Sequence, residues 1–297
     1  MKVLLMDLDV IKQRRLFPNL ALMKLSQFHK RKGDEVYLNF PLVKPDITYT
    51  SCVFTWNAKK RAIVPDGAIF GGSGINRKTE LPTEVEHIMP DYSLYPRVNF
   101  SLGFTSRGCV RRCPWCMVPE KEGGIKPWAS VHEFWDKRHR KVLLLDNNLL
   151  AAPNWKNTLS ELANLPVTVD FNQGLDIRLI DDEKVWWLTR IRTECLRFAF
   201  DDIGYERAVR EGIAKMLRAG IAKSHLSFYA LVGFNGDNTA LERLKILQSY
   251  GVNVYPMVYR GDDGREATVS LSWHGIIYWR GARNNLRRFL RVAGKLP

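Results

Sequence analysis

The stretch that decides the fold is residues 98–117, VNFSLGFTSRGCVRRCPWCM. It begins as an apolar strand over 98–104 and runs directly into a loop that carries Cys109, Cys113 and Cys116. Three thiolates in one loop can hold three irons of a cubane cluster, for which four cysteines are the usual number. The C-x3-C-x2-C spacing therefore predicts an iron–sulfur site in which one iron has no protein ligand.

A structural zinc site is the main alternative for the same three cysteines. Zinc needs a fourth ligand, and the nearest downstream histidines, His132 and His139, flank an expected helix over 131–137. The remaining cysteines, Cys52 and Cys195, lie in apolar strand-like runs and are interpreted as core residues. A disulfide framework is not expected, because the chain is long and its cysteines are few and odd in number.

Length and composition favour one large or two modest domains, since the chain has 297 residues and 45% of them are hydrophobic. The net charge of +14 favours a polyanionic partner such as nucleic acid, although a merely basic, solvated surface is an equal alternative. Asp7 and Asp9 argue against a signal peptide, and no apolar run is long enough for a membrane span. We expect a cytoplasmic protein with no membrane contact.

The first ninety residues alternate strand and helix patterns, which predicts a small parallel α/β domain. The expected strands are 2–8, 35–40, 47–54 and 68–70, and the expected helix is 18–32. The glycine-rich turn 71–74 follows the last strand and is either a plain tight turn or a place where a cofactor approaches the backbone. Residues 75–97 contain three prolines and are interpreted as a linker.

From residue 98 the alternation continues for six rounds, which predicts a curved parallel sheet, either an open barrel or a flat doubly wound sheet. The expected strands are 98–104, 141–145, 167–171, 196–200, 227–232 and 252–258, and the expected helices are 131–137, 154–163, 181–190, 206–217 and 238–249. A basic helical extension is expected over 261–297, where Arg283, Arg287 and Arg291 recur every four residues. These arginines face either water or a phosphate-bearing partner.

Polar residues or glycine follow five of these strands: the cysteine loop, Asp146, Asn172, Asp201 and Gly233. Each one alone is also an ordinary turn or cap residue. In parallel α/β folds, however, the chemistry lies at the carboxyl ends of the strands. Their shared position at one rim favours a small-molecule site.

The cysteine triad, the aromatic Trp115 and the six rounds make residues 98–258 resemble the radical S-adenosylmethionine (SAM) superfamily. The resemblance implies an α/β fold with a partial (β/α)6 TIM-like barrel over 91–260, preceded by a small Rossmann-like domain over 1–90. It also implies a 4Fe–4S cluster on Cys109, Cys113 and Cys116, with SAM on the free iron. One electron, from a flavodoxin- or ferredoxin-like protein, then cleaves SAM to methionine and a 5′-deoxyadenosyl radical.

The resemblance also assigns roles to the residues at the strand ends. The run 143–148 occupies the place of the SAM-amine motif, which implies that Asp146 or Asn147 contacts the amine, although the usual Gly-Gly-Glu is absent. Arg178 either pairs with the SAM carboxylate or forms a surface ion pair. The other implied roles are shielding of the cluster or contact with adenine by Trp115, contact with the sulfonium and ribose by Asn172 and Asp201, and backbone approach to adenine at Gly233.

The segment 1–90 resembles the cobalamin-binding domain of one branch of this superfamily. It lacks the Asp-x-His-x-x-Gly motif, as some members of that branch do, so cobalamin stays an expectation carried by the turn 71–74 alone. The substrate is undetermined, and methyl transfer or RNA modification is compatible with the basic charge. Methylthiolation is disfavoured because the N-terminal part contains only Cys52. Two alternatives stay open: a zinc-stabilised nucleic-acid-binding protein without catalysis, and a radical SAM-like protein without turnover.

Overall fold

A computed structural model of the chain describes residues 1–9, 17–40, 42–236 and 238–267. Most of the expected C-terminal extension, including its arginines, therefore lies outside the described residues. The chain forms two compact units. The first comprises Met1–Gly103, Ala129–Val142 and Asp262–Gly264, and the described part of the second comprises Phe104–Trp128, Leu143–Gly261 and 265–267.

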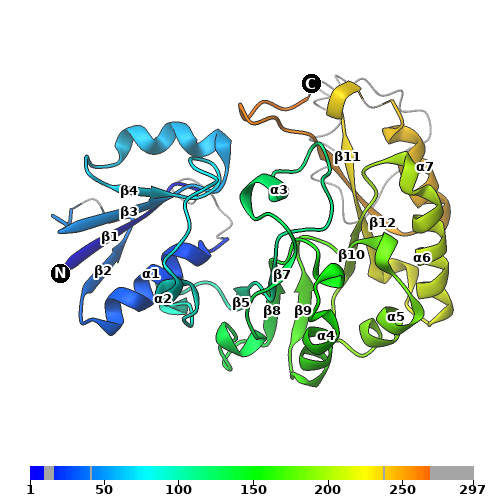
Figure 1. Ribbon diagram of the computed structural model, residues 1–297, viewed down its shortest axis with the longest axis horizontal. Helices are drawn as coiled ribbons and strands as arrows, with labels where there is room; N and C mark the ends of the chain where they lie inside the picture. The colour runs from blue at the N-terminus through cyan, green and yellow to red at the C-terminus, as the bar shows by residue number, and fades with distance from the viewer. Residues whose placement is uncertain (10–16, 41, 237, 268–297) are drawn as a thin grey trace. The chain divides into compact units, whose positions relative to one another are not determined.

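The first unit is built on a four-stranded parallel sheet with the order β2-β1-β3-β4 (Figure 1). Its strands are β1 (Lys2–Asp7), β2 (Glu35–Leu38), β3 (Ile47–Ser51) and β4 (Ile69–Gly71). All four expected strands are present, and three of them, β1, β2 and β3, end earlier than the apolar pattern does. The prediction of a parallel α/β sheet in this part of the chain is confirmed.

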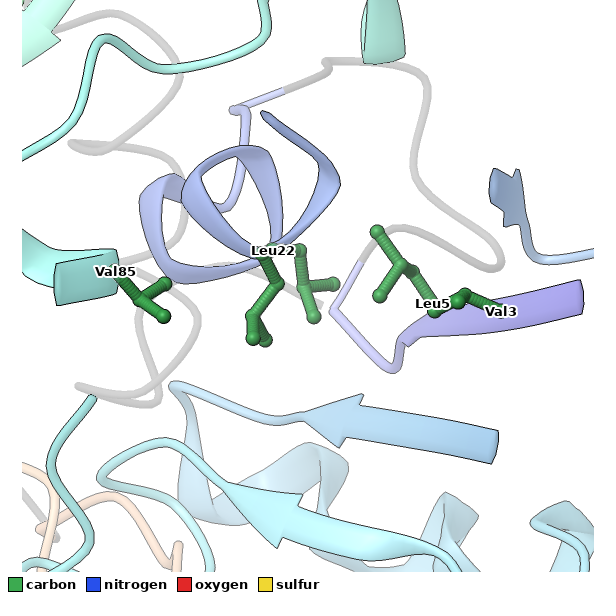
Figure 2. Packing of buried hydrophobic residues seen from close by; sticks show 5 residues of the cluster. Val3, Leu5, Leu22 and Val85 are labelled. Carbon is green, nitrogen blue, oxygen red and sulfur yellow. The ribbon is translucent and has the colours of Figure 1, made fainter. Parts of the chain in front are cut away.

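Helix α1 (Leu20–Arg31) packs against this sheet. It begins where the Asn19 side chain accepts a hydrogen bond from the Leu22 amide (3.2 Å), and it ends just before Gly33, whose φ of +80° suits glycine. Figure 2 shows Val3 and Leu5 of β1 beside Leu22 and Val85 in the core. Burial of these side chains holds the helix on the sheet.

The segment 75–97 is not the free linker that its prolines predict. It contains helix α2 (Thr83–Glu86), which supplies Val85 to the core, and a 3-10 turn at Tyr92–Leu94. Tyr95 is buried and its hydroxyl donates to Asp7 Oδ2 at 2.6 Å. The buried side chains of Val85 and Tyr95 hold this segment against the rest of the first unit.

The glycine turn 71–74 is a tight turn packed against the chain itself. A Cβ on Gly72, whose φ is +91°, would lie 2.3 Å from the Cys52 carbonyl oxygen. A Cβ on Gly74 would lie 2.7 Å from the Phe54 carbonyl carbon. These glycines are therefore required by the close approach of two backbone segments.

The second unit contains a parallel sheet with the order β10-β11-β12, formed by Leu196–Ala199, Leu226–Val232 and Asn253–Val258. Two isolated parallel bridges, Val169 to Thr193 and Leu175 to Phe198, connect β10 and the residues before it with β9 (Thr168–Phe171) and the turn after β9. Strands β8 (Lys141–Leu144) and β9 belong to another three-stranded sheet with the order β5-β8-β9, in which β5 is Ser101–Gly103. The parallel sheets β2-β1-β3-β4 and β10-β11-β12, with the helices between their strands, give the α/β arrangement that was expected.

Four helices follow these strands along the chain, and α7 packs on β11 and β12 (Figure 1). They are α4 (Trp155–Asn164), α5 (Asp182–Leu188), α6 (Glu206–Arg218) and α7 (Ala240–Tyr250). The apolar side chains Val209, Ile213 and Met216 of α6 are buried, whereas Leu217 is exposed. Among the described residues, no helix has the length and apolar character needed to cross a membrane.

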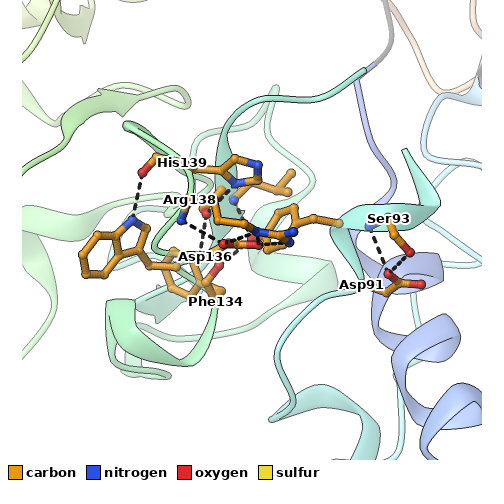
Figure 3. A network of polar contacts seen from close by, with 10 residues as sticks. Asp91, Ser93, Phe134, Asp136, Arg138 and His139 are labelled. Carbon is orange, nitrogen blue, oxygen red and sulfur yellow. Dashed lines mark hydrogen bonds and ion pairs between the residues drawn. The ribbon is translucent and has the colours of Figure 1, made fainter. Parts of the chain in front are cut away.

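The expected helix over 131–137 is only a 3-10 turn, Val131–Glu133, and a polar network continues from it (Figure 3). The Tyr92 hydroxyl donates to the Phe134 carbonyl at 2.5 Å and accepts from the Leu102 amide at 3.1 Å. Ser101 Oγ lies 3.1 Å from His139 Nδ1. Burial raises the pKa of Tyr92 to about 12, so its hydroxyl stays neutral and keeps both bonds.

We predict that Tyr92→Phe lowers the free energy of unfolding by about 1–3 kcal/mol, because it leaves a buried amide and a buried carbonyl without a partner. Tyr37→Phe is the matched control, since the Tyr37 hydroxyl donates to Glu35 on the exposed surface; we expect less than about 1 kcal/mol there. Urea unfolding of the two variants measures the difference. Equal losses would contradict a structural role for the network.

Candidate functional site

The cysteine loop, residues 108–125, is closed at its base by a short antiparallel pair, β6 (Ser106–Arg107) and β7 (Lys126–Pro127). Gly108 has a φ of +80°, and a Cβ there would lie 2.2 Å from the Gly124 carbonyl oxygen. The Cys109 amide donates to the Gly123 carbonyl at 3.2 Å. The two ends of the loop are therefore in backbone contact, and glycine is required at residue 108.

Glu122 ties the loop together from within. It follows helix α3 (Val118–Lys121), and its Oε2 accepts hydrogen bonds from the Gly108 amide (3.0 Å) and from Asn147 Nδ2 (2.7 Å). Its other oxygen lies 3.2 Å from the Arg107 guanidinium. Asn147 thus contacts the cysteine loop from the end of β8. The sequence offered no signal for Glu122, because its partners are distant in the chain or are backbone groups.

Asp146 anchors the chain where it enters the loop. Its Oδ1 accepts from the Ser106 amide (2.6 Å), the Ser106 hydroxyl (2.7 Å) and the Thr105 hydroxyl (2.7 Å), and its Oδ2 lies 3.1 Å from the Thr105 amide. The side chain is buried, which raises the pKa of Asp146, and the Ser106 and Thr105 donors oppose that rise. The carboxylate expected near the SAM amine is therefore occupied by the chain's own donors.

Asn148 lies against the first cysteine, and sequence reasoning did not single it out. Its Nδ2 donates to Cys109 Sγ at 3.4 Å and to Asp176 Oδ2 at 3.3 Å. The residue is only 3% exposed, and among the described residues its Oδ1 has no hydrogen-bond partner. A buried acceptor without a donor lowers the stability of the fold. Asn148 Oδ1 can therefore gain a hydrogen bond from a ligand or an ordered water.

Asp176 holds two arginines beside the loop. Its Oδ1 lies 2.6 Å from Arg178 Nε, and its Oδ2 lies 3.0 Å from Arg111 Nε. Burial alone would raise the pKa of Asp176, but the bonds and charges of Arg178 and Arg111 outweigh it and hold that pKa below its usual range. The Arg178 guanidinium also lies 4.1 Å from the Tyr205 ring centroid. Arg178 is therefore part of an internal ion pair at the site.

The pKa values of the Cys113 and Cys116 thiols depend on burial, on the neighbouring cysteines and on Asp201. Burial raises the pKa of Cys113 and of Cys116, and the neighbouring cysteines and Asp201 raise both further. Arg178 opposes the rise at Cys113. The residue Cys116 is exposed as a whole, but protein atoms surround its sulfur closely enough to desolvate it. Since metals bind the thiolate, loading this loop must release protons.

Asp201 lies at the carboxyl end of β10, as the sequence predicts. Burial raises the pKa of Asp201, while the Leu231 amide, which donates to its Oδ1 at 2.8 Å, and the charge of Arg243 oppose that rise. Arg243 is fully buried and donates to the Phe200 and Leu231 carbonyls, at 2.6 and 2.8 Å. A buried arginine thus fixes the ends of β10 and β11.

Trp115 contacts the residue that follows Gly233. The Trp115 ring lies 5.6 Å from that of Phe234, edge to face, directly after Gly233, whose φ is +87°. The Phe234 ring in turn contacts Tyr259 at 4.9 Å. Asn172 is at the end of β9, where its carbonyl accepts from the Tyr229 hydroxyl at 3.1 Å. The aromatic contact joins the cysteine loop to the segment after β11.

The histidines considered for zinc have other neighbours. His139 bonds Ser101 in the polar network, and His132 lies with its ring 5.8 Å from that of Trp135. Burial lowers the pKa of His139. In the described part of the chain, no three His, Cys, Asp or Glu side chains already form a group that could hold a metal ion.

We predict that Asp146→Ala lowers the free energy of unfolding by about 3 kcal/mol, because four donors lose one buried acceptor. Asp146→Asn keeps an oxygen at the same place and is expected to cost only about 1 kcal/mol. Chemical unfolding of both variants tests this. If asparagine were as damaging as alanine, the charge rather than the acceptor geometry would be the essential feature.

Comparisons with known proteins assign no family to the chain. No protein-family model matches it, and no curated protein matches it.

Proposed function

We propose that this chain is a radical SAM enzyme that holds a 4Fe–4S cluster on Cys109, Cys113 and Cys116. The observation that carries the proposal is the cysteine loop itself. Its three thiols share one backbone-closed loop at the carboxyl ends of parallel strands, next to a buried acceptor on Asn148. Ligand sites in open α/β sheets lie at that edge.

The three thiols are the donor type that a 4Fe–4S cluster takes, although in the described part of the chain they do not already form a metal-binding group. Thiolate sulfurs are the usual ligands of iron–sulfur clusters, and three of them leave one iron for another ligand. Asn148 donates an N–H to Cys109 Sγ, and the Arg111 amide lies 3.3 Å from the same sulfur. Hydrogen bonds to ligand sulfurs tune the potential of a cluster. When bound, the reduced cluster and SAM would supply reductive cleavage of the sulfonium C–S bond, giving methionine and a 5′-deoxyadenosyl radical.

The chain's own residues would bind and shield these groups. Asn148 Oδ1 is the acceptor that a ligand ammonium would meet, in place of the Asp146 carboxylate that the family motif suggests. Trp115 and Phe234 exclude water on one side of the loop. Asp201 and Arg178 set the charge around Cys113. The reaction on the substrate, including a methyl transfer, stays undetermined.

The parallel succession of β9, β10, β11 and β12 supports a partial barrel as the finer fold of this part of the chain. The order β2-β1-β3-β4 supports a Rossmann-like N-terminal unit. Cobalamin finds no support in that unit, because Gly72 and Gly74 pack on the backbone of Cys52 and Phe54. We therefore derive no step through cobalamin.

Anaerobic reconstitution with iron and sulfide tests the proposal. We expect a brown protein with about four irons per chain, and methionine with 5′-deoxyadenosine after addition of SAM and a strong reductant. Cys113→Ala should lose most of the iron and all SAM cleavage, whereas Cys195→Ala, outside the loop, should keep both.

A colourless protein with one zinc would refute the proposal and favour the zinc-stabilised alternative. A loaded cluster that never cleaves SAM would leave a radical SAM-like protein without turnover.

Gly108 provides a second, independent test of the loop. Gly108→Ala should abolish iron loading, because its Cβ would lie 2.2 Å from the Gly124 carbonyl oxygen and the loop could not close. Gly123→Ala is the matched control: φ is +71° there too, but nothing lies within 4 Å of its Cβ. It carries only the backbone strain, about 1 kcal/mol, and should retain iron. Equal iron content in the two variants would contradict the importance of loop closure.

A further inference from the structure

The carboxyl edge of the sheet in the first unit carries exposed aromatic rings. After β3, Phe54 is 41% exposed and Trp56 is 40% exposed, and their rings stack with centroids 4.6 Å apart at an interplanar angle of 18°. After β2, Phe40 is 46% exposed and stacks on Tyr37. With β1 between them, β2 and β3 lie about 10 Å apart. Large exposed apolar groups at one place on a surface usually mark a binding site.

The segment that carries Trp56 is held rigidly. Asp9 accepts from the Val53 amide (2.6 Å) and from Asn57 Nδ2 (2.9 Å). The backbone of Phe54 is also packed against Gly74. The stacked pair is therefore positioned before any partner arrives, which lowers the entropy cost of binding.

The same segment has an inner face whose side chains bond to the chain and another face whose side chains are exposed. Residues Thr55–Ile63 form a 3-10 helix, in which side chains three apart lie above one another. Asn57 and Lys60 share the inner face, where Lys60 Nζ donates to the Leu8 carbonyl at 2.5 Å. Trp56 and Lys59 share another face, and both are exposed. An aromatic ring and a cation are thus presented together.

The charge of this segment has one sign. Thr55–Ile63 contains Lys59, Lys60 and Arg61 and no acidic residue, in a chain with a net charge of +14. Stacked aromatic rings beside cations are the combination by which proteins bind single-stranded nucleic acid, with bases on the rings and phosphates on the cations. A purely apolar partner would not compensate the charge of Lys59, which is exposed.

We infer that the edge formed by Phe40, Phe54, Trp56, Lys59 and Arg61, here called the aromatic-basic edge, binds single-stranded nucleic acid. Bases stack on the exposed parts of the Trp56 and Phe40 rings, and the phosphates follow Lys59 and Arg61. The inference concerns binding alone, and it does not depend on the chemistry proposed for the cysteine loop.

Fluorescence anisotropy of a labelled, mixed-sequence single-stranded oligonucleotide tests the inference, with full-length reconstituted protein. Loss of one stacking partner should weaken binding about 5- to 100-fold, so we expect that effect for Trp56→Ala and partial recovery for Trp56→Phe. Trp186→Ala is the matched control, because Trp186 is 47% exposed and also has an arginine over its ring, but lies on α5. Circular dichroism establishes that each variant is folded.

The role of the Lys59 charge is tested by measuring how the affinity depends on salt concentration. Lys59→Ala should lower the slope of log affinity against log salt concentration by about 0.7, the value for one phosphate contact on a single strand. Lys245→Ala removes an exposed lysine on α7 and should leave that slope unchanged.

Four results would overturn the inference: no binding by the wild-type chain, equal loss in Trp56→Ala and Trp186→Ala, equal affinity for duplex of the same sequence, or a dimer of this chain that dissociates on Trp56→Ala. Failure here would leave SAM cleavage by the cysteine loop unaffected, so the two proposals are distinguishable. RNA and DNA strands of one sequence, compared in parallel, identify which sugar the edge prefers.

Discussion

The buried carboxylate of Asp146 is the contact on which the second unit depends. It sits at the end of β8 and takes the backbone and hydroxyl donors of Thr105 and Ser106, where the chain turns into the cysteine loop. Without that acceptor the donors would be buried and unpaired. Asp146 therefore fixes the entry of the loop at the end of β8, and the next two residues, Asn147 and Asn148, add contacts with Glu122 and Cys109.

That anchor explains why consecutive residues after β8 have different roles. Asp146 faces the entry of the loop, Asn147 bonds Glu122 inside it, and Asn148 faces Cys109. A family motif read by position points to Asp146 as the ligand contact. We propose Asn148 for that role instead, since it alone of the three has a buried oxygen without a donor among the described residues. A residue can occupy the position of a motif and still have all its acceptors used within the chain, as Asp146 does. A ligand donor needs an acceptor that is not already used.

The sequence predicted the regular elements of the fold well and the contacts of the site poorly. Helix α6 was expected over 206–217 and spans Glu206–Arg218, because its period of apolar residues is strong. The helix expected over 131–137 stops after one turn, since the Phe134 carbonyl accepts from Tyr92 and the Phe134 ring occupies the space that Gly103 leaves. Glu122 and Asp176 were missed because their contacts with the cysteine loop and its neighbours come from residues remote in sequence: Asn147 for Glu122, and Arg111 for Asp176.

The glycines of this chain show how a local pattern can have two physical causes. Gly72 and Gly108 both have positive φ, and at both a Cβ would lie within 2.3 Å of a carbonyl oxygen of the chain itself. From sequence alone, a glycine-rich turn after a strand can be interpreted as a place where a cofactor approaches the backbone. The structure shows whether a cofactor or another segment of the chain needs that space. At Gly72 the neighbour is Cys52, so the turn serves the close packing of two segments and supports the rigid aromatic-basic edge. At Gly108 the neighbour is Gly124, so the same conformational freedom closes the loop that holds the cysteines.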